Sequence, residues 1–185
     1  MSISTRKGDE GETDLLFGCR VKKDYPRIEV VGAVDELNAA LGLLRVSAKF
    51  EMSQREVPKF QETLITLMGE LATPVGSEHR YEERFGGSVN ADMVKHLDDL
   101  VAELEAMGAL KIKGWALPGA AGVMSGAYAD LARTVCRRAE RAVVGLEGTE
   151  EAVPNGEIVK YLNRLSDVLW LLARMEEKGG GEESS

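Results

Sequence analysis

The stretch that decides the fold is LARTVCRRAERAVVGL, residues 131–146. Its apolar residues keep the spacing of one helix face, so we expect a helix that is anchored in a core along one side. At about 100° per residue the charged residues gather on the opposite side, with Arg138 at the flank of the apolar stripe. The apolar face comprises Leu131, Val135, Ala139, Ala142, Val143 and Leu146. The opposite face comprises the charged residues Arg133, Arg137, Glu140 and Arg141 together with Val144.

Two interpretations of the arginine face follow from these residues. The first is a solvated helix face, on which the arginines form ion pairs with carboxylates one turn away. The second is an anion clamp, because guanidinium groups stay charged at any working pH and present forked donors that match phosphate oxygens. Three such groups at one-turn intervals could hold a polyphosphate. This stretch alone does not decide between the two.

The overall composition favours a single domain with local rather than general basic sites. The chain has 185 residues, of which 44% are hydrophobic, and this is enough for a sizeable core. The formal net charge of −8 argues against a nucleic-acid or membrane-surface binder, since either needs a broad basic field. Two cysteines and two histidines are too few for a disulfide framework or a zinc site, so no metal ligand is expected. With no secretory or membrane-spanning segment, the expected location is cytoplasmic.

The N-terminal segment, residues 1–24, is too rich in glycine to be a helix. Its core ISTRKGDEGETDLLFGCR, residues 3–20, is either a flexible tail or a loop with a binding role. Glycines three residues apart would let main-chain N–H groups curl around an anion. Lys23 could reach the same anion or could be solvated, and Pro26 is expected to keep the following chain extended. The candidate anion-binding residues are Thr5, Arg6, Lys7, Gly8, Thr13 and Lys23.

The remaining pattern predicts an all-α fold, an up-and-down bundle of about five helices spanning residues 25–177 and followed by a disordered tail at 178–185. Residues 73–89 read as an excursion without chemistry, and residues 110–134 as a loop that feeds the arginine helix. The other helices are expected at 34–48 after a turn at Gly32, at 57–73 with Pro58 in its first turn, from 90 or 91 to 107, and at 157–177.

Two further residues have alternative interpretations. Asp35 lies in the first turn of an expected helix, where the helix macrodipole alone would explain it. It could instead face an arginine of the central helix and orient its guanidinium. Trp115 lies in a loop rich in glycine and proline, where it either plugs the end of the bundle or offers a flat face to a ligand.

Three separated stretches, read together, resemble the PduO-type ATP:cob(I)alamin adenosyltransferases. They are TRKGDEG-x-T at residues 5–13, VGAVDELNAALG at 31–42, and ARTVCRRAER with YLNRLSD at 132–141 and 161–167. The resemblance runs from about residue 5 to 174. It implies a trimer of five-helix bundles with active sites between subunits, which uses ATP, Mg²⁺ and cob(I)alamin.

The resemblance also implies roles for individual residues. The TRKG motif with Thr13 corresponds to the loop that wraps the triphosphate, and Lys23 to a phosphate-contacting lysine. Arg133 and Asp35 match an inter-subunit pair near the corrin, and Trp115 stands where the family commonly has a phenylalanine that displaces the lower axial ligand of cobalt. The implied nucleotide contacts are Arg137, Arg138, Glu140, Arg141 and Asn163.

The implied reaction transfers the 5′-deoxyadenosyl group of ATP to cobalt and releases triphosphate. Cobalt(I) is itself the nucleophile, so the protein orients the reactants and stabilises the leaving group through Arg137, Lys23 and Mg²⁺. A reductase and an adenosylcobalamin-dependent acceptor enzyme are possible partners. The chain departs from the family at Ala129-Asp130, where Leu-His is usual, and in a longer interval from Pro118 to Arg133. These departures motivate an alternative, a nucleotide-responsive corrinoid carrier with little turnover; a purely structural bundle is the third hypothesis.

Overall fold

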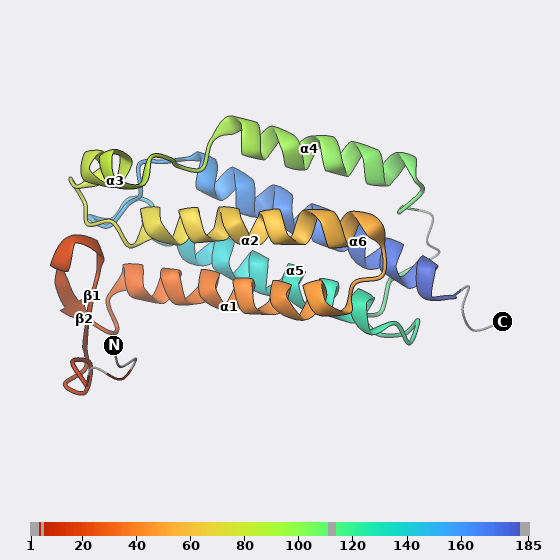
Figure 1. The fold of residues 1–185 in the computed structure, drawn as a ribbon, viewed down its shortest axis with the longest axis horizontal. Helices are drawn as coiled ribbons and strands as arrows, with labels where there is room; N and C mark the ends of the chain where they lie inside the picture. The colour runs from red at the N-terminus through yellow and green to blue at the C-terminus, as the bar shows by residue number, and fades with distance from the viewer. Residues whose placement is uncertain (1–3, 5, 111–113, 182–185) are drawn as a thin grey trace.

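The computed structural model describes residues 4, 6–110 and 114–181 of the chain. Five long helices lie side by side, a short helix closes one end, and a small hairpin precedes the first long helix (Figure 1). The elements are β1 (Glu12–Asp14), a 3-10 turn at Leu16–Gly18, β2 (Arg20–Lys22), α1 (Pro26–Ser47), α2 (Glu51–Leu71), α3 (Glu78–Phe85), α4 (Ala91–Ala106), α5 (Met124–Val144) and α6 (Glu157–Gly181).

The arginine-bearing helix α5 is central to the bundle because it packs against both α1 and α6. Its buried face is lined by small residues, including Ala132, Cys136 and Ala139, all fully buried. Small side chains let neighbouring helices approach closely. At Gly126 an added Cβ would lie 3.2 Å from the main-chain oxygen of Ala173 in α6. The predicted apolar face is therefore confirmed except at Leu131, which is 44% exposed.

The two ends of this bundle differ. The strap end contains residues 6–25, the starts of α1 and α6 and the ends of α2 and α5 (Figure 1). The loop end contains residues 107–110 and 114–123, which lie between α4 and α5, with the ends of α1 and α6 and the starts of α2 and α5. The length of α5 separates the two ends, about 30 Å at 1.5 Å per residue.

Several predicted boundaries were wrong, and proline explains two of them. Pro26 does not keep the chain extended; it starts α1, where its fixed φ and missing N–H suit the first turn. Gly32 is accordingly an internal residue of α1 rather than a turn. Pro58 lies two turns inside α2, not in its first turn. The central helix begins at Met124, one to two turns earlier than expected, and α6 continues to Gly181, past the start of the expected tail.

The expected helical fold is confirmed, with one addition: a small hairpin of β1 and β2 pairs Thr13 with Val21 in an antiparallel register. The segment between α2 and α4 also contains a helix, α3, that the charge-rich sequence did not reveal. In contrast, α4 begins at Ala91 as predicted, with Asn90 as its N-cap: the Asn90 side chain accepts hydrogen bonds from the main-chain N–H groups of Asp92 and Met93, both at 3.1 Å. Within the described ranges, no helix combines the length and the apolar character that crossing a bilayer requires.

Candidate functional site

The exposed face of α5 carries two arginines that make no contact with other charges. Arg137 and Arg141 are exposed, and no hydrogen bond or ion pair joins either to another residue described in the structure. The flanking Arg138 is paired with Glu36 of α1, and both side chains remain about half exposed. Two guanidinium groups one turn apart are thus available to an anion, so the solvated, fully ion-paired interpretation does not describe this face.

A hydrogen bond between α5 and α6 lies beside these arginines. The Nδ2 of Asn163 donates to Oε1 of Glu140 at 3.0 Å, and Oδ1 of Asn163 accepts from Nη1 of Arg164 at 3.3 Å. Both side chains are half-buried. The structure therefore brings together Arg137, Glu140, Arg141 and Asn163, four of the residues that the sequence singled out.

Arg133 and Asp35 are not paired within one chain. Arg133 donates from Nε to Oδ1 of Asp130 at 3.3 Å, and its side chain is 25% exposed. Asp35 is exposed on α1, and it has no hydrogen-bond or ion-pair partner in the portion of the chain that the structure covers. A single chain leaves the expected pairing between subunits untested.

The N-terminal segment folds back on itself as a strap. Arg20 of β2 bonds with Glu12 at 3.2 Å and with Asp14 at 3.4 Å, and it also donates to the main-chain oxygen of Lys7. These contacts pin the glycine-rich turn to the hairpin. Sequence reasoning missed Arg20, because a strand of only three residues has no readable alternation.

Lys23 completes the strap by lying against Gly8. A Cβ added to Gly8 would come within 3.0 Å of the Lys23 Nζ, and the Lys23 main-chain N–H donates to Gly11 O at 2.9 Å. The predicted residues Gly8 and Lys23 are thus adjacent, while Thr13 is half-buried in β1 and Thr5 lies outside the described residues. An open hollow of the strap is lined by Arg6, Lys7, Asp9, Glu10, Asp14 and Arg20.

The strap is attached to the bundle by contacts that do not involve the predicted site. The Leu16 N–H donates to Ala72 O at 2.9 Å, and the guanidinium of Arg80 lies 4.3 Å from the centre of the Phe17 ring. The Tyr25 hydroxyl donates to Glu151, and this bond raises the Tyr25 pKa to about 12. These contacts hold the strap at the end of the bundle where the arginine helix terminates.

A fully buried arginine, Arg27, organises the same end. It is 1% exposed and donates to the main-chain oxygens of Leu71, Thr73 and Ala152 at 2.7–3.2 Å, while its Nε bonds with Glu151 at 3.1 Å. Helical spacing could have indicated this role, because Arg27 lies on the buried face of α1 that Val30 and Val34 continue.

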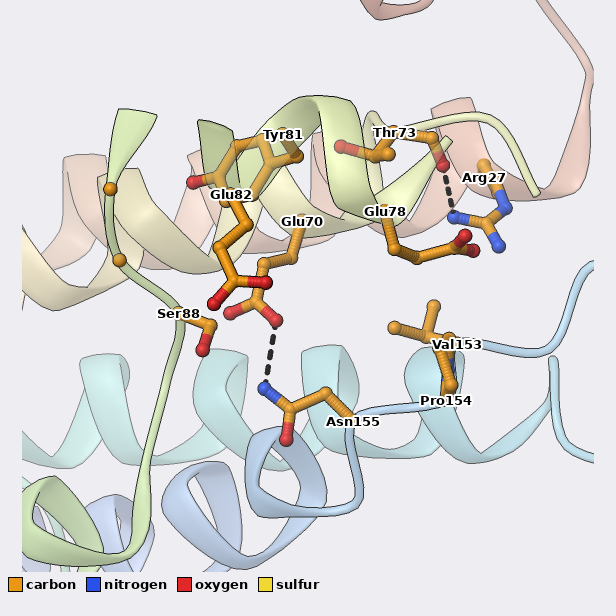
Figure 2. A pocket seen from close by; sticks show the side chains of 12 residues that line it. Arg27, Glu70, Thr73, Glu78, Tyr81, Glu82, Ser88, Val153, Pro154 and Asn155 are labelled. Atoms are coloured by element: carbon orange, nitrogen blue, oxygen red, sulfur yellow. Dashed lines mark hydrogen bonds between the residues drawn. The ribbon is translucent and has the colours of Figure 1, made fainter. Parts of the chain in front are cut away.

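Arg27 also borders a cavity of about 380 Å³ beneath α3. Figure 2 shows Glu70 and Asn155 pointing toward each other across it, joined by a hydrogen bond of 2.7 Å. Burial raises the pKa of Glu70, against the effect of hydrogen bonds from Asn155 and from the Val89 N–H. None of the predicted site residues lines this cavity, so it does not coincide with the arginine face.

Trp115 lies at the loop end, away from the strap. Its side chain is 95% exposed, so the interpretation as a plug of the bundle is wrong, and its aromatic face is free for a ligand. The neighbouring Leu117 is also exposed, at 67%. Trp115 belongs to the segment that leads into the start of α5, whereas the hairpin of the strap lies at the opposite end of the bundle (Figure 1).

Asp130 is buried rather than at the surface. Only 2% of it is exposed, and it accepts hydrogen bonds from Arg133 and from Arg174 of α6. Cys136, one turn before Glu140, is fully buried, and burial raises its thiol pKa, which keeps the thiol neutral. These residues shape the helix from inside and are not open to a ligand.

Comparisons with known proteins show the family to which the chain belongs. A family model described as cobalamin adenosyltransferase matches residues 3–176. A cobalamin adenosyltransferase from Cupriavidus metallidurans is 41% identical over 180 residues, which cover 97% of this chain and 90% of that protein. The corrinoid adenosyltransferase PduO of Citrobacter freundii is 37% identical over 96% of this chain; the chain spans 50% of the length of that protein.

Solved structures are similar over nearly the whole chain. A variant PduO-type ATP:corrinoid adenosyltransferase from Lactobacillus reuteri, complexed with cobalamin and ATP, has a TM-score of 0.81 and 28% identity and covers 98% of this chain and 96% of its own. A second variant from the same organism, complexed with ATP, has a TM-score of 0.82 and 26% identity, covering 97% and 96% of the two chains. The fold is thus shared, over nearly the whole chain, with proteins solved in complex with ATP, one of them also with cobalamin.

Proposed function

The chain belongs to the cobalamin adenosyltransferase family, and we propose that its two ends divide the substrates of an ATP:corrinoid adenosyltransferase between them. In this reaction the 5′-deoxyadenosyl group of ATP moves to the cobalt of cob(I)alamin and triphosphate leaves. The observation that carries the proposal is the pair of exposed, unpartnered arginines on α5, Arg137 and Arg141, beside the Glu140–Asn163 hydrogen bond.

ATP would bind at the strap end. Arg137 and Arg141 present donors for phosphate oxygens, and the turn around Gly8 presents main-chain N–H groups and the ammonium group of Lys23. The further strap residues Thr5, Arg6, Lys7 and Thr13 lie in the same segment and would close over the triphosphate. Arg138 is bound to Glu36 in the free chain and would have to exchange that partner for ATP.

The corrinoid would bind where Trp115, Arg133 and Asp35 of different subunits meet. Because one chain holds the strap and Trp115 at opposite ends, a complete site requires a neighbouring copy. We therefore propose a homotrimer in which Arg133 of one subunit pairs with the free Asp35 of the next. Trp115 would contact the corrinoid and displace the lower axial ligand.

A magnesium ion would be held mainly by the triphosphate. Among the described residues there is no group of three or more His, Cys, Asp or Glu side chains that could hold a metal by themselves. Mg²⁺ commonly keeps several waters and binds through substrate phosphates with one or two carboxylates. Carboxylates of the strap, such as Asp9 and Glu10, fit that limited role, and the ion would neutralise charge on the leaving group.

The proposed chemistry needs orientation and charge stabilisation rather than an acid or a base. The electron pair of cobalt(I) forms the new bond to C5′, the C5′–O bond breaks, and its electron pair leaves with triphosphate. Arg137, Lys23 and Mg²⁺ would stabilise the charge that accumulates there. Holding C5′ in line with cobalt would supply several kcal/mol of the barrier. A cytoplasmic reductase and an acceptor enzyme that uses adenosylcobalamin would complete the cycle.

The test is incubation of the purified protein with ATP, Mg²⁺ and chemically reduced cobalamin while the absorption spectrum is followed. We expect the spectrum of the adenosylated product together with one triphosphate released per product. Binding of both substrates without product would instead support the carrier hypothesis, which the altered residues Ala129 and Asp130 motivate. Absence of ATP binding would leave only a structural bundle.

A further inference from the structure

A buried group of charges at the loop end links the arginine helix to α6. Asp130 and Arg174 are 2% and 1% exposed, and Nη2 of Arg174 donates to Oδ2 of Asp130. The other carboxylate oxygen, Oδ1, accepts from Nε of Arg133 at 3.3 Å. One carboxylate is therefore shared between two arginines on two helices.

The second bond is not needed to satisfy the buried ion pair. Arg174 already has a second carboxylate, since Glu177 one turn later lies 2.7 Å from its Nε and accepts from its Nη2 at 3.0 Å. Asp130 could have been balanced by Arg174 alone. Instead it also holds Arg133, a residue whose side chain reaches the surface.

Holding Nε orients the remainder of the guanidinium. The group is planar, so a fixed Nε–H direction limits the rotation of Arg133 and leaves its terminal nitrogens, Nη1 and Nη2, for another anion. No hydrogen bond within the described residues engages these two atoms. Arg174 in turn fixes Asp130 against α6, so the orientation depends on two packed helices rather than on one flexible side chain.

We propose that Asp130 is a positioning residue, which Arg174 anchors on α6 and which holds Arg133 in the orientation that the corrinoid side of the site requires. This inference rests on the proposed function, because Arg133 receives its role there. It assigns a task to a residue that departs from the usual histidine of the family. Asp130 would then orient Arg133 in place of that histidine, and the corrinoid site would be retained.

The central experiment compares Asp130→Asn with the matched control Glu177→Gln. Both remove one carboxylate charge from Arg174, but only the first also touches Arg133. For Asp130→Asn we expect kcat/KM for the corrinoid to fall about 10- to 100-fold, the scale of a misplaced reacting group, and KM for ATP to change less than about twofold. For Glu177→Gln we expect lower thermal stability with both kinetic constants unchanged.

A second readout is independent of turnover. Titration of the ATP-loaded protein with cob(II)alamin, followed by absorption, should give a Kd that rises in Asp130→Asn and is unchanged in Glu177→Gln. In the Arg133→Ala background, Asp130→Asn should cause no further loss of corrinoid binding, although its effect on stability should persist. A full additional loss in that background would overturn the inference.

Two outcomes separate the inference from its premise. If the unaltered protein makes no adenosylated product, the proposed function fails; if it is active and Asp130→Asn matches it, only the positioning role fails. Should Asp130→Asn not fold, the double variant Asp130→Leu with Arg174→Met replaces the buried pair by apolar side chains, an exchange that proteins often tolerate. It should fold and show the same selective loss; equal losses toward ATP and corrinoid would contradict positioning.

Discussion

Each end of the bundle buries one arginine, but the two arginines are satisfied in different ways. At the strap end Arg27 donates mainly to main-chain oxygens, those of Leu71, Thr73 and Ala152. At the loop end Arg174 is held by the carboxylates of Asp130 and Glu177. The strap end is therefore fixed mainly by main-chain acceptors, and the loop end by buried ion pairs between helices.

The same contrast extends to other acidic residues. Near the loop end the almost fully buried Glu176 accepts hydrogen bonds from the N–H groups of Lys49 and Phe50 and from the Ser125 hydroxyl. At the strap end the Glu70 pKa is raised by burial, so its contribution to stability is greatest below its ordinary pKa and is lost as pH rises through the folded value. The Glu56 pKa near the start of α2 is instead lowered, so protonation of Glu70 and protonation of Glu56 should change stability in opposite directions.

The largest expected effect is loss of the Arg27 clasp. Arg27→Met keeps an apolar stem but leaves three main-chain oxygens and Glu151 without their donor. We expect the free energy of unfolding to fall by about 3 to 5 kcal/mol, as is typical when one partner of a buried charged network is removed. Urea unfolding followed by circular dichroism measures it. Arg45→Met, at an exposed arginine bonded to Gln61, is the control and should change stability by less than about 0.5 kcal/mol. Equal effects of the two variants would remove the distinction between the ends.

The second largest effect is expected at the proposed ATP site of the strap end. Arg137→Ala should lose about 2 to 4 kcal/mol of transition-state stabilisation, measured as kcat/KM for ATP, because a donor to the leaving group is removed. The unfolding midpoint should not change, since Arg137 is exposed and makes no hydrogen bond or ion pair with another described residue. Lys160→Ala, which removes an exposed lysine of α6, should leave the kinetics unchanged. Normal turnover in Arg137→Ala would exclude this arginine from the site.

A smaller effect is expected at the proposed contact between Asp35 and Arg133 of neighbouring subunits. Asp35→Asn should weaken the pairing with Arg133 of a neighbouring subunit by about 2 kcal/mol, at the lower bound for a buried charged pair that loses one partner. Sedimentation at a series of concentrations should then show a looser trimer, and kcat/KM for the corrinoid should fall. A variant that remains a fully active trimer at the lowest concentration contradicts the pairing.

The smallest expected effect tests the pH contrast at Glu56, close to the start of α2. Burial opposes its ionisation, but hydrogen bonds from Arg55, His96 and Lys59 outweigh burial and lower the Glu56 pKa to about 2. The folded pKa is below the ordinary value, so this stabilisation is present above about pH 4.3 and is lost as pH falls toward 2. Between pH 6 and pH 3 unfolding should become easier by about 1 to 2 kcal/mol from this group.

Glu56→Gln supplies the comparison for that pH series. The variant should be less stable than the unaltered protein at pH 6, and the difference should shrink as the pH approaches 3. Urea unfolding at both pH values measures it. A difference between the two proteins that is constant with pH would show that Glu56 is not the titrating group.

The helices could be predicted from sequence where their apolar period was unbroken. The stripes of α1 and α6 were identified residue by residue: Val34, Leu37, Leu41 and Leu44 are all fully buried, as is Ile158 at the start of α6. The predicted helix boundaries at Pro26, Gly32 and Pro58 were wrong, because tertiary packing outweighs the local propensity of proline and glycine in a long buried helix. The hairpin was missed because strands of three residues have no readable alternation.

The site could be predicted in its parts but not in its connections. Arg137, Glu140, Arg141 and Asn163 were each named as nucleotide contacts through the family resemblance, but the hydrogen bond between Glu140 and Asn163 was not predicted. The contacts of Arg27 and the bond between Arg174 and Asp130 were missed because the bonded residues lie 44 or more positions apart, and a single sequence contains no distances between such positions. Trp115 shows the same limit: its loop composition allowed a buried or an exposed ring.

The position of the strap and Trp115 at opposite ends of α5 has a consequence for how subunits could share work. In the proposed trimer every active centre would draw its halves from two polypeptides, and a closed head-to-tail ring leaves no half unmatched. Two inactive proteins, one altered at Arg137 and one at Trp115, should then restore activity to each other when unfolded and refolded as a mixture. Such complementation would also mean that a defective copy impairs centres formed with its healthy neighbours, so that damage in a mixed population would not simply scale with the dose of the altered protein.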